Sequence, residues 1–517
     1  MIEEVIKSFT FVQWALVTLG AFVVYDFVKK VRKDSKIRRL GGRAPMRKGW
    51  LPFGLDIAYS SLMSLLRNET VEHIGWIMKK FGNKNHPYTV EFQVAGQRIV
   101  MTADHENIKA ILATQFNDYG KGPKFNEDFH DFLGDSIFTT DGEIWHNSRQ
   151  LIRPQFIKDR LSDIQIFERH SKLLVPLLGA GSGKTVDVLD LFFRFTLDAS
   201  TDFLLGRSVE SLSHPQTQFA EAFNDVQHTQ SMIVRVNDLN WMIPRRKFKQ
   251  NLKVMNDFVE PFIESALALS ADELEKRTKS DEGYTFLHAI AGYTRERKVL
   301  RDQLVAILLA GRDTTACTLS WLFYELSLKP EVVKKLRAEI MSRVGPTNEP
   351  SYEDLKSMKY MQHCLNEILR IYPIVPFNVR VALKDTTLPH GGGADGLQPI
   401  GILEGTPVGY STYLMQHRED IYPSVESGFP PIEEFVPERW DNWTPKAWTY
   451  VPFNGGPRIC IGQQFALTEM GYTITRILQR YSSIQNRMSE PPMLKADIVL
   501  QPGSGVQLAF FEDEKSQ

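Results

Sequence analysis

An apolar run flanked by charge dominates the start of the chain. Residues 8–25 carry no charged side chain, and about 20 apolar residues suffice for a helix that crosses a bilayer. Basic side chains crowd residues 29–43 against a single acidic one, Asp34. Because positive charge marks the cytosolic side of a span, the pattern predicts a single-pass anchor with the rest of the chain in the cytosol. A cleaved signal peptide would instead carry its basic residues before the apolar run.

Beyond the anchor, the periodicity predicts a mainly helical body with small β-sheets. Residues 88–102 alternate apolar and polar positions about Ala95-Gly96, which is typical of a hairpin. From about 105 to 340 the pattern is mainly helical, and residues 301–329 form one long candidate helix that Pro330 ends. The centre of this helix is apolar all round, so we expect it to be buried.

Caps, short strands and turns fill the C-terminal third of the chain. Ser351 and Asp354 have the spacing of a capping box. Glycine, proline and β-branched residues predict short strands over 373–412. We expect the last helix over 463–481 and a closing hairpin over 494–511.

These segments predict three consecutive parts. They are an N-terminal membrane anchor over 1–28, a basic and proline-containing linker over 29–54, and a catalytic body over 55–517. The apolar fraction of 43% and the charged fraction of 24% are ordinary for a packed globular protein. They exclude a disordered, collagen-like or multi-span membrane chain.

Charge and short motifs argue against a nucleic-acid partner and a bound nucleotide. The chain of 517 residues carries 61 Lys and Arg against 62 Asp and Glu, a net charge of −1. Residues 178–185 read LGAGSGKT, but Leu178 stands where a phosphate-binding loop needs glycine. No GxGxxG segment occurs either, so the sequence indicates no dinucleotide site of its own.

The cysteines point to one reactive thiol. Three cysteines in a chain of this length form no disulfide framework and indicate a reducing compartment. Cys317 and Cys364 lie in helical segments and are interpreted as structural. Cys460 stands in a tight loop, FNGGPRICIG over 453–462, directly before a predicted helix. The helix N–H groups and its positive end would favour thiolate over thiol.

A thiolate in this position has the chemistry of an axial haem ligand. Thiolate donation to a porphyrin iron favours cleavage of an O–O bond, so we predict Cys460 as the ligand of the iron. In the same loop, Phe453 could lie against the porphyrin and Arg458 could meet a propionate.

The spacing FxxGxRxCxG resembles the haem segment of the cytochrome P-450 superfamily, and the resemblance covers essentially the whole chain after the anchor. It implies the P-450 fold, with a long central helix crossing the haem. It also implies haem b, iron protoporphyrin IX, held without a covalent link apart from the Cys460 thiolate bond. A related animal branch carries a haem-esterified Glu where this chain has Ala310.

Residues 310–315, AGRDTT, resemble the family's oxygen-activation segment. The resemblance implies that Gly311 opens the helix wall over the iron. Thr314 and Asp313 would be the catalytic residues, with the Thr314 hydroxyl assisting oxygen activation and Asp313 relaying protons from water. Arg312 is expected to face away from the haem.

Two further sets of residues match the family. Glu367 and Arg370, three apart on one helix face, would join Arg439 in a buried structural cluster. The resemblance also implies that Trp145, Arg149 and Arg380 contact the haem propionates. A basic patch for an acidic electron donor would consist of Arg149, Arg153, Lys158 and Arg160.

The branch resemblance is to fungal long-chain alkane and fatty-acid ω-hydroxylases. It rests on residues 307–321, 376–393 and 453–470, which read ILLAGRDTTACTLSW, PFNVRVALKDTTLPHGGG and FNGGPRICIGQQFALTEM. A hydrocarbon chain requires an apolar channel. The candidate wall residues are Phe125, Phe129, Phe132, Ile374, Val375 and Phe377.

The expected activity is that of a membrane-anchored haem-thiolate monooxygenase in the endoplasmic reticulum, which hydroxylates a lipophilic small molecule. Its expected partners are an NADPH-cytochrome reductase, cytochrome b5 and membrane lipid. Three alternatives stay open: a tailoring enzyme of a fungal secondary-metabolite pathway, a reductase-independent isomerase or dehydratase, and a haem sensor or scaffold.

Overall fold

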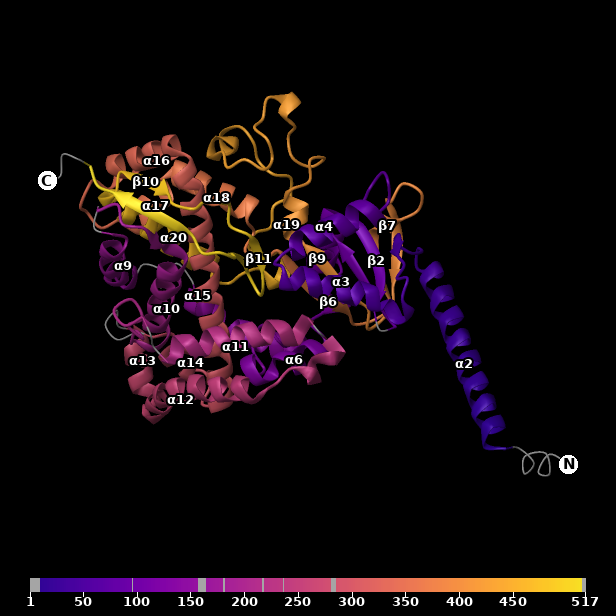
Figure 1. The fold of residues 1–517 in the computed structure, drawn as a ribbon. Coiled ribbons are helices and arrows are strands. Elements are labelled where there is room, and N and C mark those ends of the chain that lie inside the picture. The colour runs from indigo at the N-terminus through magenta and orange to yellow at the C-terminus, as the bar shows by residue number, and fades with distance from the viewer. Residues whose placement is uncertain are drawn as a thin grey trace. The chain divides into compact units, whose positions relative to one another are not determined.

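The computed structural model describes residues 10–513, apart from 95, 157–163, 180–181, 216–217, 236 and 280–284. The described chain is mainly helical with small β-sheets, as predicted (Figure 1). It divides into two compact units. The sheet unit comprises residues 1–57, 76–120 and 380–409, and the helical unit comprises residues 58–75, 121–379 and 410–517.

The sheet unit combines strands from the N-terminal part of the chain with strands from residues 380–409. Its helices are α2 (Phe11–Arg39) and α5 (His105–Lys109). Its strands are β1 (Met46–Arg47), β2 (Thr89–Val94), β3 (Gln97–Thr102), β4 (Tyr119–Gly120), β7 (Thr386–Gly392) and β8 (Gln398–Ile402). Four elements run across the unit boundaries: α3 (Leu55–Leu66), α4 (Thr70–Phe81), β6 (Phe377–Ala382) and β9 (Pro407–Ser411).

The largest described sheet has the strand order β1-β2-β3-β9-β6-β4. The predicted hairpin at 88–102 is confirmed, because β2 and β3 pair antiparallel from Thr89–Thr102 to Val94–Gln97. β1 pairs with β2 in parallel, and β7 forms a separate ladder with β8. Part of the segment expected as a linker thus belongs to the sheet.

The helical unit holds most of the hydrophobic core. Its helices are α6 (Pro123–Leu133), α7 (Gly142–Ile152), α9 (Gln165–Leu177), α10 (Val188–Leu205), α11 (Gln218–Arg235), α12 (Arg246–Ala268), α13 (Ala271–Lys279), α14 (Phe286–Ala291), α15 (Arg297–Leu328), α16 (Pro330–Arg343), α17 (Tyr352–Ser357), α18 (Lys359–Ile371), α19 (Thr412–Gln416) and α20 (Gln463–Arg480). Its strands are β5 (Val186–Asp187), β10 (Ser483–Asn486), β11 (Leu494–Ala496), β12 (Leu500–Pro502) and β13 (Gln507–Phe511).

Helix α15 is the long buried helix that the sequence predicts. Its bounds, Arg297–Leu328, agree with the expected 301–329 to within a few residues, and Pro330 begins α16. It packs along α10 and also contacts α18 and α20. Trp321 of α15 stacks on Tyr372, with the ring centroids 4.1 Å apart. Because its side chains are apolar all round the helix, α15 packs against other elements on several sides at once.

Among the smaller predicted elements, one is confirmed in detail and one is wrong. The Ser351 hydroxyl accepts the Asp354 N–H, while the Asp354 carboxylate accepts the Ser351 N–H, completing the capping box of α17. The closing hairpin over 494–511 does not form as expected. β12 pairs with β11 around Asp497, and β13 instead joins β10 and β5.

Helix α2 runs from Phe11 to Arg39 and includes the start of the expected linker. No helix in the part of the chain that the structure describes is both long enough and apolar enough to span a bilayer. The predicted span, 8–25, begins among residues 1–9, which lie outside the described residues.

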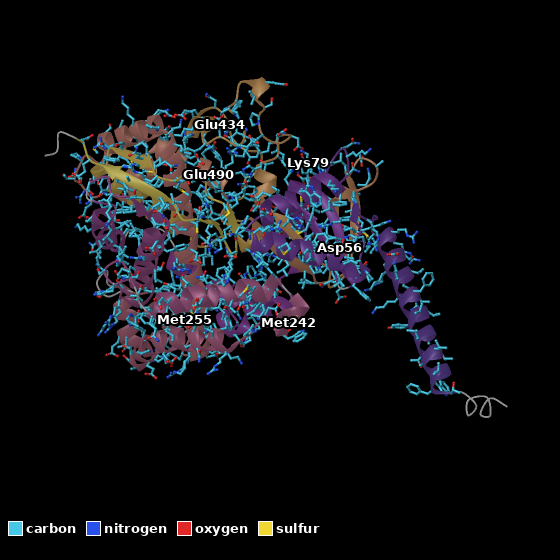
Figure 2. All side chains as sticks on the ribbon, viewed as in Figure 1. Asp56, Lys79, Met242, Met255, Glu434 and Glu490 are labelled. Atoms are coloured by element: carbon cyan, nitrogen blue, oxygen red, sulfur yellow. The ribbon has the colours of Figure 1, made fainter. Side chains whose placement is uncertain are left out.

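Side chains fill the interior of each unit (Figure 2). Met255 of α12 is buried, whereas Met242, in the 3₁₀ turn Asn237–Met242, is exposed.

Candidate active site

A backbone hydrogen bond and several glycines shape the loop that carries Cys460. The Cys460 N–H donates to the Phe453 carbonyl at 3.0 Å, and Gly462 caps the N-terminus of α20. Gly456 has a φ of 64°, in the left-handed region that favours glycine. A Cβ at Gly455 would lie 2.5 Å from the Trp448 ring, so no side chain fits there. The glycines of the motif therefore hold the cysteine at a fixed place before the helix.

The Cys460 side chain is accessible, yet it is surrounded by protein. It is exposed to solvent, while burial among the surrounding protein atoms raises the pKa of its thiol above the ordinary value. The Gly462 N–H and the Arg149 charge oppose this increase but do not outweigh it. The Gly462 N–H at the start of α20 thus acts in the expected direction, towards the thiolate, but burial outweighs it in the protein chain by itself.

These surroundings fit an axial haem thiolate. A metal ion deprotonates the thiol that coordinates it, and an N–H at the sulfur is a typical way to temper its donor strength. Cys317 and Cys364 are fully buried, and burial raises the pKa of both thiols. They behave as structural residues, as predicted.

Trp145 and Arg458, two predicted haem contacts, lie together. The Arg458 guanidinium lies 4.5 Å from the Trp145 ring centroid. One Arg458 nitrogen donates to Asp141 Oδ1 at 2.6 Å and to the Thr140 carbonyl at 2.8 Å. Asp141 also accepts the backbone N–H of Gly122 at 2.8 Å. Asp141 was missed by the sequence analysis, because no local motif shows that it meets Arg458.

Arg149 supports the cysteine loop directly. Its Nη1 donates to the Ile459 carbonyl at 3.0 Å, one residue before Cys460. Burial and the nearby Arg153 charge lower the pKa of Arg149. Its predicted propionate contact stays a prediction, as does that of Phe453, which is half-buried against the hydrophobic core.

The predicted propionate contact of Arg380 and the predicted basic patch for an electron donor are not tested by the geometry of this loop. Arg380 is buried on β6, in the sheet unit, and its contact with a propionate stays a prediction. Lys158 and Arg160 lie outside the described residues. Of the expected basic patch, Arg153 is exposed and Arg149 is partly buried.

Three residues of the predicted oxygen-activation segment lie in a narrow accessible stripe on α15. Between residues 302 and 324, every side chain is buried except those of Ile307, Ala310, Gly311 and Thr314. This spacing of three and four residues describes one helix face. The Thr314 hydroxyl donates to the Ala310 carbonyl at 2.8 Å. The stripe is therefore apolar except for a single hydroxyl.

Asp313 and Arg312 are buried as an ion pair. Arg312 Nη1 lies 3.0 Å from Asp313 Oδ1, and the guanidinium lies 4.7 Å from the Phe193 ring centroid. Burial raises the pKa of Asp313 and lowers that of Arg312. Asp313 is thus held by the Arg312 cation, and its role as a proton relay stays a prediction.

Gly311 has a packing role. A Cβ at this position would lie 2.8 Å from Ser200 Oγ of α10. The missing side chain therefore allows α10 to approach α15 closely. The predicted opening over the iron stays a prediction.

The expected Glu367, Arg370 and Arg439 cluster is confirmed. Arg370 donates two hydrogen bonds to Glu367, at 2.8 and 2.9 Å, and Arg439 Nε donates to Glu367 Oε1 at 3.1 Å. All three side chains are buried. Trp440, which was not predicted, donates its Nε1–H to Glu367 Oε2 at 2.9 Å. The cluster ties α18 to the segment that leads to the cysteine loop.

The candidate channel-wall residues differ in how deeply their side chains are buried. Phe132 and Ile374 are buried in the interior, where Phe132 packs edge-on against Phe223. Phe125 stacks on Phe129 with the ring centroids 4.5 Å apart. Val375 is partly exposed. We therefore keep Phe125 and Val375, with the half-buried Phe377, as the better candidates for substrate contact.

Comparison with known proteins identifies clear relatives. The family model described as Cytochrome P450 matches residues 58–510. Cytochrome P450 monooxygenase pvhE of Talaromyces variabilis is 47% identical over 512 residues, 95% of this chain and 94% of that protein. Cytochrome P450 52A4 of Candida maltosa is 43% identical over 449 residues, 82% of this chain and 81% of that protein. Cytochrome P450 monooxygenase g430 of a Fusarium species is 39% identical over 487 residues, 90% of this chain and 83% of that protein.

Proposed function

We propose that this chain, which belongs to the cytochrome P450 family and is a monooxygenase of that family, hydroxylates the terminal carbon of a long-chain alkane or fatty acid. When bound, the haem activates O₂ and allows one oxygen atom to enter a C–H bond. Electrons come from NADPH through a separate reductase, because the chain has no dinucleotide motif of its own.

The accessible stripe on α15 carries this proposal. An apolar wall for a hydrocarbon chain is formed by Ile307, Ala310 and Gly311. These residues have no polar side-chain group that would lose its hydrogen bonds when a methylene group covers it. Thr314 supplies the single hydroxyl. The branch resemblance at 307–321 and 376–393 supports the same substrate class.

The residues around the stripe and around the cysteine have separate roles. The Thr314 hydroxyl holds and passes a proton at the reacting end of the substrate. Arg149 and Gly462 fix and polarise the Cys460 loop. The cluster around Glu367 fixes the segment before this loop.

A second substrate class remains as the alternative. The same apolar stripe would accept the lipid or polyketide tail of a metabolite in a fungal secondary-metabolite pathway.

We propose further that the enzyme works at the endoplasmic reticulum membrane, attached through α2. Large apolar side chains of α2 are exposed, among them Phe11, Leu16, Val24, Tyr25 and Phe27. Basic residues end the helix, which suits the anionic cytoplasmic leaflet. The exposed Arg153 would then contribute to docking an acidic reductase or cytochrome b5.

The test is turnover of a substrate panel by the purified enzyme with an NADPH-cytochrome reductase. n-Alkanes and fatty acids of graded length are incubated with NADPH, and the products are identified by mass spectrometry. A terminal alcohol is expected from at least one chain length. An inert panel, or turnover without NADPH, would overturn the proposal.

Variants in α15 add a mechanistic readout to the same assay. Thr314→Ala should slow hydroxylation by about 10²–10⁴, the usual cost of losing a general acid, and should divert the unused NADPH into hydrogen peroxide. Thr318→Ala is the matched control, because its hydroxyl makes the same kind of bond, to the Thr314 carbonyl at 2.8 Å, but is buried. Equal coupling in the two variants would remove Thr314 from the mechanism.

A further inference from the structure

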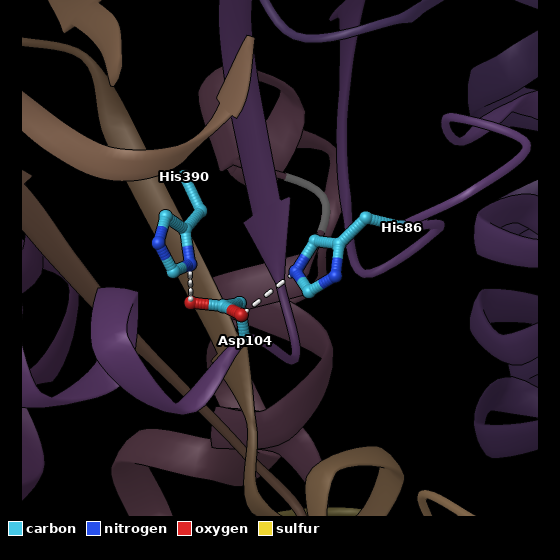
Figure 3. Close-up of side chains that lie close together, drawn as sticks. All are labelled: His86, Asp104 and His390. Carbon is cyan, nitrogen blue, oxygen red and sulfur yellow. Dashed lines mark hydrogen bonds and ion pairs between the residues drawn. The ribbon is translucent and has the colours of Figure 1, made fainter. Parts of the chain in front are cut away.

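The sheet unit brings together two histidines and an aspartate that the monooxygenase reaction does not use. His86 lies between α4 and β2, Asp104 lies between β3 and α5, and His390 lies on β7. His86 Nε2 is 2.8 Å from Asp104 Oδ2, and His390 Nδ1 is 3.1 Å from Asp104 Oδ1. Figure 3 shows the two imidazoles approaching the carboxylate from opposite sides.

The local backbone holds these side chains in place. The Asp104 carboxylate caps α5 by accepting the Asn107 N–H at 3.0 Å. The buried Asn107 amide donates to the His390 carbonyl and accepts the His390 N–H, both at 2.9 Å. Two of the three side chains are thus positioned through one asparagine, so little conformational entropy is lost when they bind a common partner.

The charge and burial of the cluster favour a cation. The Asp104 carboxylate is fully buried between the two imidazoles and lies within hydrogen-bonding distance of both. The His86 and His390 side chains are 12% and 25% exposed, which leaves a route for an ion from solvent.

We propose that His86, Asp104 and His390 form a binding site for a divalent transition-metal ion of the zinc class. Imidazole nitrogen and carboxylate oxygen are preferred zinc ligands, at about 2.0–2.2 Å. Two nitrogens on one ion must therefore lie within about 4.2 Å of each other. The three ligand atoms already lie within 4.8 Å of one another. The two imidazole nitrogens lie beside different oxygens of the Asp104 carboxylate. An ion placed between these two oxygens would therefore reach both nitrogens after a small rotation of one imidazole.

The ion would serve the structure of the sheet unit. It would join the loop before β2, the start of α5 and strand β7, which are far apart in the sequence. Three protein ligands leave a fourth position for water on the partly exposed side.

The test is zinc binding to the haem-loaded enzyme, measured by isothermal titration calorimetry. In this form Cys460 is engaged by the iron, and the other two cysteines are buried. We expect one Zn²⁺ per chain and at least tenfold weaker binding after His86→Ala or His390→Ala, since even outer-shell changes typically cost about 10–100-fold. His214→Ala is the matched control, because His214 is an exposed histidine near a carboxylate of Glu210.

A structural readout separates a metal site from a hydrogen-bonded cluster. X-ray absorption at the zinc edge should show two imidazole ligands at about 2.0 Å. Asp104→Asn removes the charge but keeps the capping oxygen, so it tests the carboxylate without deleting the cap of α5. Undiminished binding in all three variants, or no binding by the parent enzyme, would overturn the proposal and leave a cluster held by hydrogen bonds alone.

Discussion

Glu469 is a carboxyl group enclosed between two helices. It lies on α20, nine residues after Cys460, and is fully buried. Burial raises its pKa to about 8, and the Thr315 hydroxyl of α15 offsets only part of this increase. The carboxyl group is therefore mostly protonated at neutral pH, and its neutrality allows α20 to pack against α15.

Replacing Glu469 should change how stability depends on pH. The unfolded chain loses this proton near the ordinary value of 4.5, whereas the folded chain keeps it up to about pH 8. Between these values the folded state binds one more proton, so the free energy of unfolding falls as pH rises, by about 1.4 kcal/mol per pH unit. Glu469→Gln, a neutral mimic of the protonated acid, should remove this slope.

The measurement is the thermal midpoint of unfolding between pH 5 and pH 8.5. Glu490→Gln is the control, because Glu490 is exposed at the surface (Figure 2). If Glu469→Gln kept the pH slope of the parent enzyme, the carboxyl group would have to be ionised in the folded state.

The sequence predicts residues well where a local motif carries the chemistry. The spacing of FxxGxRxCxG identifies Cys460, and the pair Glu367 and Arg370 is found from helical spacing, with Arg439 placed by resemblance. Asp141 and Trp440 could not be found in this way, because each becomes a partner only through the fold. The net pKa of the Cys460 thiol could not be predicted for a related reason: a loop sequence shows a helix end but not the extent of burial.

The contact between α10 and α15 depends on the absence of a side chain at Gly311. A Cβ at Gly311 would meet Ser200 Oγ at 2.8 Å and Ser200 Cβ at 3.7 Å. The first distance is a clash, and the second is an ordinary contact. The serine hydroxyl therefore accounts for the whole steric conflict.

Gly311→Ala should destabilise the enzyme by about 1–3 kcal/mol, the usual cost of overpacking a core. In a Ser200→Ala background the same change should be neutral or stabilising by up to about 1 kcal/mol, because alanine is the better helix former. Thermal unfolding of the two single variants and the double variant measures this coupling. Additive effects would show that Gly311 does not pack against Ser200.

Helices with a clear period are predictable, whereas strand partners are not. The apolar pattern of α15 gives its bounds to within a few residues. The segment 494–511 has the composition of one hairpin, yet it holds three strands: β11 and β12 pair with each other, and β13 pairs with β10 and β5. The alternation of side chains shows that a segment is a strand but not which distant strand completes its ladder.

At the scale of the whole molecule, ion pairs and a backbone hydrogen bond fix the C-terminal end of α2 to the rest of the sheet unit. Arg43 forms ion pairs with Asp34 of α2 and with the buried Glu91 of β2. The Gly401 N–H of β8 donates to the Gly42 carbonyl at 2.9 Å. The end of α2 is therefore continuous with the folded body.

Removing residues 1–28 should release the enzyme from membranes without unfolding it. The deletion takes away exposed apolar side chains of α2 but keeps Asp34, Arg43 and Glu91. In a flotation assay with phosphatidylcholine and phosphatidylserine vesicles, the full chain should float and the shortened chain should stay in the dense fraction. Equal flotation of the two chains would place the membrane contact elsewhere on the protein.

The shortness of β1 and β4 has a consequence for handling the protein. These outer strands of the largest described sheet are two residues long each. Exposed strand edges are templates on which other chains can add and aggregate, and very short edge strands are a common protection against this. Concentrated solutions should therefore resist edge-to-edge association, provided that engineered chains retain Met46 and Arg47.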